Sequence, residues 1–176
     1  MGLITKRKER TYRAATANGV VAAAGADMFF VITGSATKEV HVHKLRIRGL
    51  HLTTLAVVGV VVEKRSTAPS GGTASALITV PLDSASPTAT ADLVQVYTVA
   101  PTEGTLIGTI AANRPMLKSA TVVDGASFTD LEFVFGDHDE TQPVILRGVT
   151  QNLSLAFAAA PASAVTLDVE VEWTEE

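Results

Sequence analysis

Two histidines at alternate positions are the residues that come nearest to a metal site. His41 and His43 are separated by one residue, and alternate residues of a β-strand share a face, so both imidazoles could ligate one cation. The stretch that follows, from Lys44 to Arg48, supplies three cations and no carboxylate. These positive charges oppose a bound metal ion. We therefore interpret the pair as part of a polar strand face and expect no metal there.

Two acidic clusters offer further chemistry. The run Asp137-His138-Asp139-Glu140 combines carboxylates with an imidazole, as calcium or zinc sites do, but its spacing is not that of an EF-hand loop. We interpret it as a charged loop. Asp168, Glu170 and Glu172 alternate near the C-terminus, so on a strand they would share a face at roughly 6.6 Å intervals, a separation that also occurs between glycosidase acids. Aromatic residues make up only 5% of the chain, which leaves few rings to hold a sugar. We expect a solvated face or a docking strip for a basic segment of a neighbouring chain.

Other catalytic signatures are missing from the sequence. Cysteine is absent, which removes disulfides, zinc–thiolate sites and cysteine nucleophiles. No Gly-x-Ser-x-Gly elbow and no phosphate- or dinucleotide-binding glycine pattern occurs. A metal enzyme of the cupin type would need a glutamate shortly after His43 and a second histidine-containing motif, and neither is present. We predict that the protein is not an enzyme and has no cofactor.

The segments that must position these residues have the pattern of β-strands. A chain of 176 residues is long enough for one domain with its own core. From Val165 to Thr174, apolar and polar side chains alternate, as in a strand with one wet face. Similar signals predict about nine strands, among them 29–33, two within 40–64, 76–80, 93–99, 105–111, 131–135, 144–146 and 153–157. The predicted fold class is all-β: a two-sheet antiparallel sandwich, jelly-roll-like, with an extended basic N-terminal arm.

Two local patterns carry more detailed predictions. Pro101 presets a turn and Gly104 can take positive φ, so the segments 93–99 and 105–111 are predicted to form a hairpin with a short loop. From Leu55 to Val62 the chain is apolar at both alternating sets of positions. Such a strand should be covered by the core on one face and by a loop or another subunit on the other.

The N-terminal segment differs in charge from the rest of the chain. Its five cations face only Glu9, a formal +4, so the remainder carries −8 within a net charge of −4. We take residues 1–26 as an extended arm and 27–176 as the sandwich domain, and we expect that removal of residues 1–13 spares the fold. A basic arm on an acidic body suggests contact with an acidic surface, such as that of a neighbouring copy, although a solvated terminus is the alternative. The candidate partner-contact residues are Lys6, Arg7, Lys8, Arg10 and Arg13.

Membrane and nucleic-acid partners are not expected. The longest apolar run, 50–62, is shorter than the roughly 20 residues that a spanning helix needs. Polar residues interrupt the one N-terminal stretch that could serve as the core of a signal peptide. The cations form no stripe interleaved with aromatic residues, which is the usual footprint of nucleic-acid binding.

Three blocks of sequence give a more specific indication: 42–110, 144–149 and 165–176. The first holds a valine-rich strand that ends in Glu63-Lys64-Arg65-Ser66-Thr67, then a Gly-Gly loop, and then Val80-Pro81-Leu82-Asp83-Ser84. The last ends in Val171-Glu172-Trp173-Thr174-Glu175-Glu176. Together they resemble small β-sandwich virion structural proteins of tailed bacteriophages, of the head decoration or cement type.

The resemblance implies a function, partners and a location. The chain is expected to decorate or cement a capsid through contacts with the major capsid protein or other virion subunits, and to form a homo-oligomer, with a trimer as the expected form. Its expected place is the virion, on the head surface rather than the tail, after synthesis in the host cytoplasm. A tail-, baseplate- or fibre-associated structural protein and a carbohydrate-binding sandwich module are the alternatives.

Overall fold

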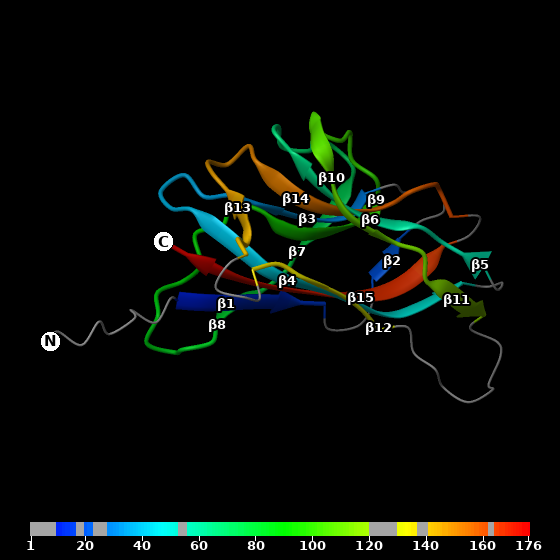
Figure 1. The fold of residues 1–176 in the computed structure, drawn as a ribbon, viewed down its shortest axis with the longest axis horizontal. Helices are drawn as coiled ribbons and strands as arrows, with labels where there is room; N and C mark the ends of the chain where they lie inside the picture. Colours follow the sequence, from blue (N-terminus) through cyan, green and yellow to red (C-terminus); the bar gives the residue numbers. More distant parts are fainter. Residues whose placement is uncertain are drawn as a thin grey trace, which may run out of the picture.

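The computed structural model of the chain describes residues 10–16, 20–22, 28–52, 56–119, 130–136, 141–161 and 164–176. Within them the chain forms fifteen strands, which build two sheets packed face to face (Figure 1). The strands are β1 (Arg10–Ala15), β2 (Val20–Ala22), β3 (Met28–Thr33), β4 (Val40–Leu52), β5 (Ala56–Val57), β6 (Val60–Arg65), β7 (Thr73–Ala76), β8 (Thr79–Pro81), β9 (Val94–Val99), β10 (Leu106–Asn113), β11 (Met116–Ser119), β12 (Asp130–Val134), β13 (Val144–Leu146), β14 (Asn152–Phe157) and β15 (Val165–Glu175). The prediction of an all-β two-sheet sandwich is confirmed.

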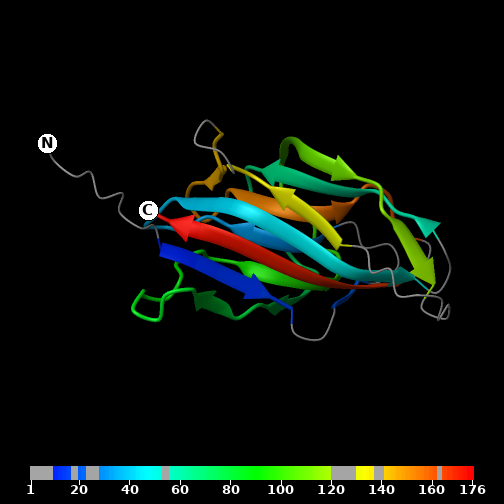
Figure 2. The ribbon, with the colours of Figure 1, turned by 60° about the horizontal axis from the view of Figure 1, so that its bottom comes forward.

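One sheet has nine strands and is built around β4 and β15. Its main path runs β5-β11-β4-β15-β1-β8, while β12 and β13 also pair with β4, and β2 pairs with β15. The strands β13, β12 and β11 follow one another along one edge of β4. On the opposite edge of β15, β1 and β2 do the same. The two long strands therefore organise the whole sheet, and both lie in its middle (Figure 2).

The second sheet has six antiparallel strands in the order β10-β6-β14-β3-β9-β7, so β10 and β7 form its edges. Only Leu77 and Ile78 separate β7 from β8, which is the edge strand of the other sheet. At this corner the chain passes from one sheet to the other. The single strand predicted at 76–80 is therefore divided between the two layers.

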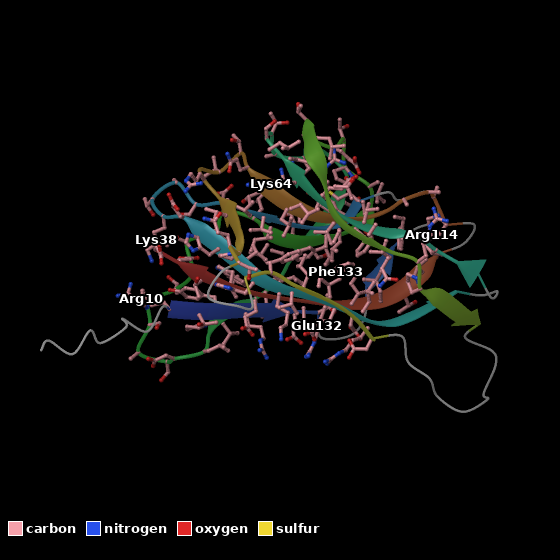
Figure 3. All side chains as sticks on the ribbon, in the orientation of Figure 1. Arg10, Lys38, Lys64, Arg114, Glu132 and Phe133 are labelled. Atoms are coloured by element: carbon pink, nitrogen blue, oxygen red, sulfur yellow. The ribbon has the colours of Figure 1, made fainter. Side chains whose placement is uncertain are left out.

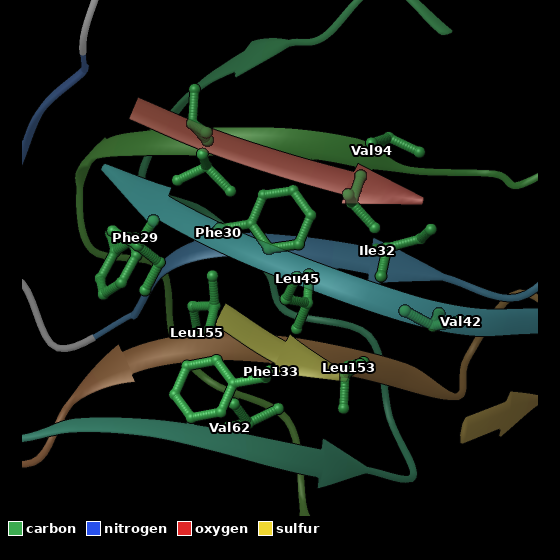
Figure 4. Close-up of a cluster of buried hydrophobic side chains, with 14 of the residues drawn as sticks. Phe29, Phe30, Ile32, Val42, Leu45, Val62, Val94, Phe133, Leu153 and Leu155 are labelled. Carbon is green, nitrogen blue, oxygen red and sulfur yellow. The ribbon is translucent and has the colours of Figure 1, made fainter. Parts of the chain in front are cut away.

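The core lies between the sheets. Leu45 of β4 and Val171 of β15 belong to one buried cluster with Phe30 of β3 and Leu155 of β14, and each of these side chains is fully buried. Figure 4 shows Leu45, Phe30 and Leu155 directed into this layer. Burial of each such side chain stabilises the fold by about 1.5–3 kcal/mol. The core thus draws on both layers and on distant parts of the sequence.

The alternation predicted for the C-terminal strand is confirmed. The odd-numbered residues of β15 from Val165 to Trp173 are at most 1% exposed. The even-numbered residues, Thr166, Asp168, Glu170 and Glu172, are half-buried on the other face. By contrast, β14 is buried along its whole length, including Ser154 and Ala156, which alternate with its larger apolar side chains. Ala156 packs with Met28, Val31 and Tyr97 in a second, smaller cluster. The outer face of the six-stranded sheet is therefore covered at this point.

A β-bulge in β4 explains an irregularity in its sequence. Val42 pairs with Trp173 and Lys44 pairs with Glu172, so His43 is an extra residue opposite the regular ladder of β15. Val40 and Val42 face the core on one side of the bulge, and Leu45 and Ile47 face it on the other. Without the extra residue, these four inward-facing side chains would lie at every second position of one regular strand. The bulge thus accommodates the change of parity between positions 42 and 45.

The hairpin prediction is wrong. Strand β9 lies between β3 and β7, whereas β10 pairs with β6 at the opposite edge of the same sheet. The intervening loop bonds elsewhere: the backbones of Ser70 and Thr102 exchange two hydrogen bonds of 2.8 and 3.0 Å. Gly104 is not among the glycines with positive φ. It packs so closely on Thr67 that an added Cβ would lie 1.8 Å from the Thr67 carbonyl oxygen, so close approach, and not a left-handed conformation, requires glycine there.

The single strand predicted at 55–62 also differs from the structure. Two strands, β5 and β6, occupy the described part of this stretch, and Val58 and Gly59 lie between them. In β6, Val60 and Val62 are buried in the main core, while Val61 packs against the smaller cluster of Met28, Val31, Tyr97 and Ala156. Neighbouring strands of its own sheet therefore contact the outer side chain.

The described part of the N-terminal segment belongs to the sheet. Strand β1 lies between β15 and β8, and the buried Tyr12 ring stacks on Trp173 with centroids 5.8 Å apart. Such an aromatic pair adds about 0.5–1.5 kcal/mol to the burial of the two rings. Removal of residues 1–13 would take Tyr12 away, so from this contact we now expect the deletion to destabilise the fold. A deletion that spares β1 must end before Arg10.

The bulge makes a prediction about deletions. Deletion of His43 should leave every core position of β4 facing inward and cost about 1–2 kcal/mol, because its hydrogen bond to Thr174 and the bond from the Phe135 amide are lost. Deletion of Arg46, two positions beyond Lys44, should turn buried side chains to solvent at about 1.5–3 kcal/mol each. Urea unfolding of both variants measures the difference. Equal losses would contradict the assignment of His43 as the extra residue.

Candidate interaction surfaces

The outer face of the nine-stranded sheet carries charged side chains in columns that follow the strands. Lys44, Arg46 and Arg48 point outward from β4, and the register places each of them between a residue of β12 and an acid of β15. Thus Arg46 lies opposite Glu132 on one side and opposite Glu170 on the other. Beyond β15, Arg13 of β1 pairs in register with Glu172. Because alternate residues of each strand share a face, the strand pairing alone generates acidic, basic and acidic columns on β12, β4 and β15, with Arg13 beside the last of them.

Ion pairs join neighbouring columns. Glu132 accepts a hydrogen bond from Arg46 and lies 3.3 Å from Lys44 Nζ. Arg13 forms a hydrogen bond with Glu172, and its Nε lies 3.4 Å from Glu170 Oε1. The hydrogen bond from Arg46 lowers the pKa of Glu132, and the bond to Glu172 raises the pKa of Arg13. Each such exposed pair contributes at most about 1 kcal/mol, so the columns matter more for surface pattern than for stability.

These contacts bear on the basic residues predicted to touch a partner. The acidic strip of Asp168, Glu170 and Glu172 does receive a cation of the N-terminal segment, but Arg13 supplies it from the same chain. Thr16 also donates a hydrogen bond of 2.8 Å to Asp168 Oδ1. Arg10 is exposed at the start of β1. Lys6, Arg7 and Lys8 lie outside the described residues.

The predicted metal candidates have other contacts. His41 Nε2 lies 3.5 Å from Glu39 Oε2 and 4.0 Å from Glu176 Oε2, while His43 Nε2 is 2.9 Å from the Thr174 hydroxyl. Across the described ranges, no three His, Asp or Glu side chains are grouped so as to hold a metal ion. The run Asp137–Glu140 lies outside the described residues.

Sequence reasoning missed a buried carboxylate at the end of β15. Glu175 has the parity of the core face, and its side chain is fully buried. Its two oxygens accept hydrogen bonds from the Thr90 amide and hydroxyl, the Ala91 amide and Trp173 Nε1, at 2.7–3.1 Å. Lys38 Nζ lies 3.6 Å away. Glu175 thus fastens the loop after β8 to the C-terminal strand and to the Trp173 ring.

Burial raises the pKa of Tyr12, and the negative charge of Glu175 makes a second, smaller contribution in the same direction. No hydrogen-bond partner for the buried Tyr12 hydroxyl lies among the described residues. Only the position of Glu175 in an otherwise alternating strand could have signalled it: a glutamate stands where the period requires an apolar residue.

A second buried polar group attaches loops at one end of the six-stranded sheet. Arg65 is 6% exposed and donates hydrogen bonds to the Gly104 carbonyl at 2.6 Å, to Glu63 at 2.5 Å and to Glu103. Its neighbour in register, Asn152, donates to the Thr67 carbonyl at 2.8 Å. These bonds attach the loops 66–72 and 100–105 to the sheet. They hold the 100–105 loop away from the position that it would have in the predicted hairpin.

Exposed apolar side chains gather on two edge strands. Ile78, Val80 and Leu82 flank or belong to β8 and are 82%, 51% and 55% exposed. On β10, Leu106, Ile107 and Ile110 are 42–57% exposed. Apolar side chains clustered at a sheet edge are typical of surfaces that contact other proteins. We refer to these two groups as the β8 strip and the β10 strip.

The edges differ in what they offer a partner. The Leu82 amide donates a hydrogen bond to the Thr11 carbonyl. In an antiparallel pair the hydrogen-bonded positions alternate, so Val80 opposite Arg13 is the next bonded residue. Pro81 lies between them and directs its nitrogen to the free edge. A proline there cannot donate a hydrogen bond to an added strand. In β10, register shifts leave Ile107 and Ile110 out of the ladder with β6. Both edges are thus protected against strand addition, and contact must involve side chains.

Aromatic rings are used inside the molecule. Trp173, Tyr12, Tyr97, Phe29 and Phe30 are all at most 1% exposed. The Tyr97 hydroxyl accepts a hydrogen bond of 2.5 Å from Gln95. Rings that serve the core in this manner are not available to stack on a sugar.

Comparison of the chain with models of protein families, with curated protein sequences and with solved structures found no match. In the part of the chain that the structure describes, no helix has the length and apolar character needed to cross a bilayer.

Replacement of the buried carboxylate tests its role. Glu175→Gln places an amide group against the Thr90 and Ala91 donors and near Lys38, so at least one buried donor loses its acceptor. The free energy of unfolding should fall by at least about 2 kcal/mol. Glu176→Gln, one residue on and exposed, is the matched control and should change it by less than about 0.5 kcal/mol. Equal effects of the two changes, measured by urea unfolding, would show that Glu175 is not a fastening point.

The charged columns predict how stability depends on acid. Because Arg46 lowers the pKa of Glu132 in the folded state, the unfolded chain binds a proton at a higher pH than the folded chain does. The contribution of Glu132 is therefore complete above the ordinary glutamate pKa and is lost as pH falls through the lowered value. Glu132→Gln should flatten the acid limb of a stability–pH curve measured by urea unfolding. A steeper or unchanged limb would contradict the pairing.

Proposed function

We propose that the chain is a structural virion protein that decorates or cements the head of a tailed bacteriophage through subunit contacts. The resemblance of blocks 42–110, 144–149 and 165–176 to such proteins motivates the proposal. The sandwich fold is compatible with it, and a jelly-roll order of strands remains part of the expectation. The major capsid protein or another virion subunit is the proposed partner, and a homo-oligomer, expected to be a trimer, is the proposed state.

The exposed apolar edges carry the proposal most directly. The β8 strip presents three large apolar side chains, of which Ile78 is the most exposed large hydrophobic residue described. Such side chains favour burial by about 25 cal/mol per Å² of apolar area. One small strip gives weak binding, but many copies on one particle bind cooperatively through multivalency. A surface of this kind suits a protein that acts in an ordered array.

The carbohydrate-binding alternative has less support. Glycan sites rely on exposed aromatic rings, and the described tyrosines and tryptophan are buried in the two apolar clusters. A structural protein of the tail, baseplate or fibre would use the same edges, so location in the particle distinguishes it from a head protein.

The β8 strip predicts the behaviour of a charged variant. Ile78→Asp should reduce incorporation into purified particles at least about tenfold, since an apolar contact of about 1.5–3 kcal/mol is replaced by a buried charge. Val149→Asp is the matched control, because Val149 is exposed in the turn after β13, on the opposite edge of the sheet. Quantitative mass spectrometry of particles measures incorporation, and gold labelling places the protein on head or tail. Absence of the unmodified protein from particles would overturn the proposal.

The basic residues before β1 predict a second effect. Deletion of residues 1–9 retains β1 and its stack on Trp173, so the unfolding temperature should change by no more than a few degrees. If Lys6, Arg7 and Lys8 contact an acidic partner, incorporation should fall, and the difference should shrink at high salt. Unchanged incorporation at low salt would count against a role for these three cations.

A further inference from the structure

The charged columns form a pattern that is complementary to itself. Across the outer face of the nine-stranded sheet, Asp130 and Glu132 make β12 acidic, β4 is basic and β15 is acidic, and β1 adds one cation, Arg13. Figure 2 shows these four strands side by side on the near face. In Figure 3, Glu132 lies on the side of the sheet away from the second layer. This face is therefore open to solvent, with side chains that range from 20% exposed for Glu170 to 55% for Asp130.

The geometry of the columns distinguishes two ways of stacking this face on the same face of a second copy. A two-fold axis that runs along the seam between β4 and β15 reverses the order of the columns. Each basic β4 then lies over the acidic β15 of the other copy, and β12 lies over β1. A two-fold axis across the strands keeps the order, and like charges then face each other. Only the first arrangement brings opposite charges together.

The register along the strands agrees with this axis. A rotation about an axis parallel to the strands leaves positions along them unchanged, so Lys44 would face Glu172 of the second copy, and Arg46 would face Glu170. These are the rows that pair within one chain. Sheet twist separates two stacked sheets away from their axis. The three cations and three acids of β4 and β15 are nearest to it, where contact is closest.

We infer that the outer face of the nine-stranded sheet binds the same face of a second copy, about a two-fold axis parallel to β4 and β15. This contact stands apart from the β8 and β10 strips and does not depend on a role in a virion. The aliphatic stems of the lysine and arginine side chains supply apolar contact, and the charges set orientation. A two-fold contact coexists with a trimer in an assembly of dihedral symmetry.

Sedimentation velocity of the full chain tests the inference. The dimer should form as concentration rises in 50 mM NaCl and should weaken at least about tenfold in 500 mM NaCl, because exposed charges are screened. Arg46→Glu should weaken it at least about tenfold at low salt, and the double change Arg46→Glu with Glu170→Arg should restore it, since the columns are complementary again. Arg114→Glu, an exposed arginine beyond β10, is the control for net charge and should have no such effect. A monomer at every concentration, or equal effects of Arg46→Glu and Arg114→Glu, would overturn the inference.

Cross-linking tests the direction of the axis without changing a charge. The chain has no cysteine, so single cysteines can be placed at Val134 of β12 and Ala15 of β1, both exposed. With the axis along the strands, a mixture of Val134→Cys and Ala15→Cys chains brings the two thiols to about 10–12 Å, while identical positions are further apart by about three strand spacings, or roughly 14 Å sideways. A short bismaleimide should therefore link the mixture and neither variant alone. Efficient linking of Val134→Cys to itself, or no linking of the mixture, would overturn the inference.

The two proposals can fail separately. A chain that remains monomeric but is found in particles contradicts only the self-association. A chain that dimerises through this face but is absent from particles contradicts only the virion function.

Discussion

The pairing of β4 with β15 is constrained on both of its faces. On the inner face, Leu45, Ile47, Val169 and Val171 must meet the second sheet, and a slip of one residue would turn them all to solvent. On the outer face, the same slip would remove each cation of β4 from its position opposite an acid of β15. Burial and charge therefore select the same register. The bulge at His43 allows this register to continue past the change of parity in β4, and the strands β12, β13 and β1 then add to edges already fixed.

Polar residues complete the fold where the sheets end. Glu175 stands at the rim of the core, where four protein donors and Lys38 surround it. Arg65 has the equivalent place at an end of the six-stranded sheet, where it bonds to Glu63, Glu103 and the Gly104 carbonyl. Buried charges are tolerated only with such partners. Each group attaches a long loop to a strand, so these loops are held by side chains and not by tight turns.

The exterior divides into surfaces of different chemistry. The edges near β8 and β10 are apolar and resist strand addition, because Pro81 lacks an amide hydrogen and β10 is bulged. The broad face over β4 and β15 is charged, and cations and acids alternate across it. An apolar edge gives binding free energy without much orientation, whereas alternating columns give orientation without much binding free energy. Together they suit a protein that takes a defined place among other subunits.

Local patterns of residues were enough to predict the all-β class and the inward faces of several strands. Alternation is a local property: two-residue periodicity fixes which side of β15 is buried before any partner strand is known. The choice of partner strand is not local, and it became visible only in the folded chain. Pro101 and Gly104 carry the signal of a turn, but the hydrogen bonds of their loop go to 66–70, so β9 and β10 lie at opposite edges. Likewise Arg13 and the acids of β15 were recognisable as complementary, but only the insertion of β1 beside β15 showed that one chain supplies both. Charge and pattern limit which contacts are favourable, and the three-dimensional path of the backbone determines which of them a chain can make with itself.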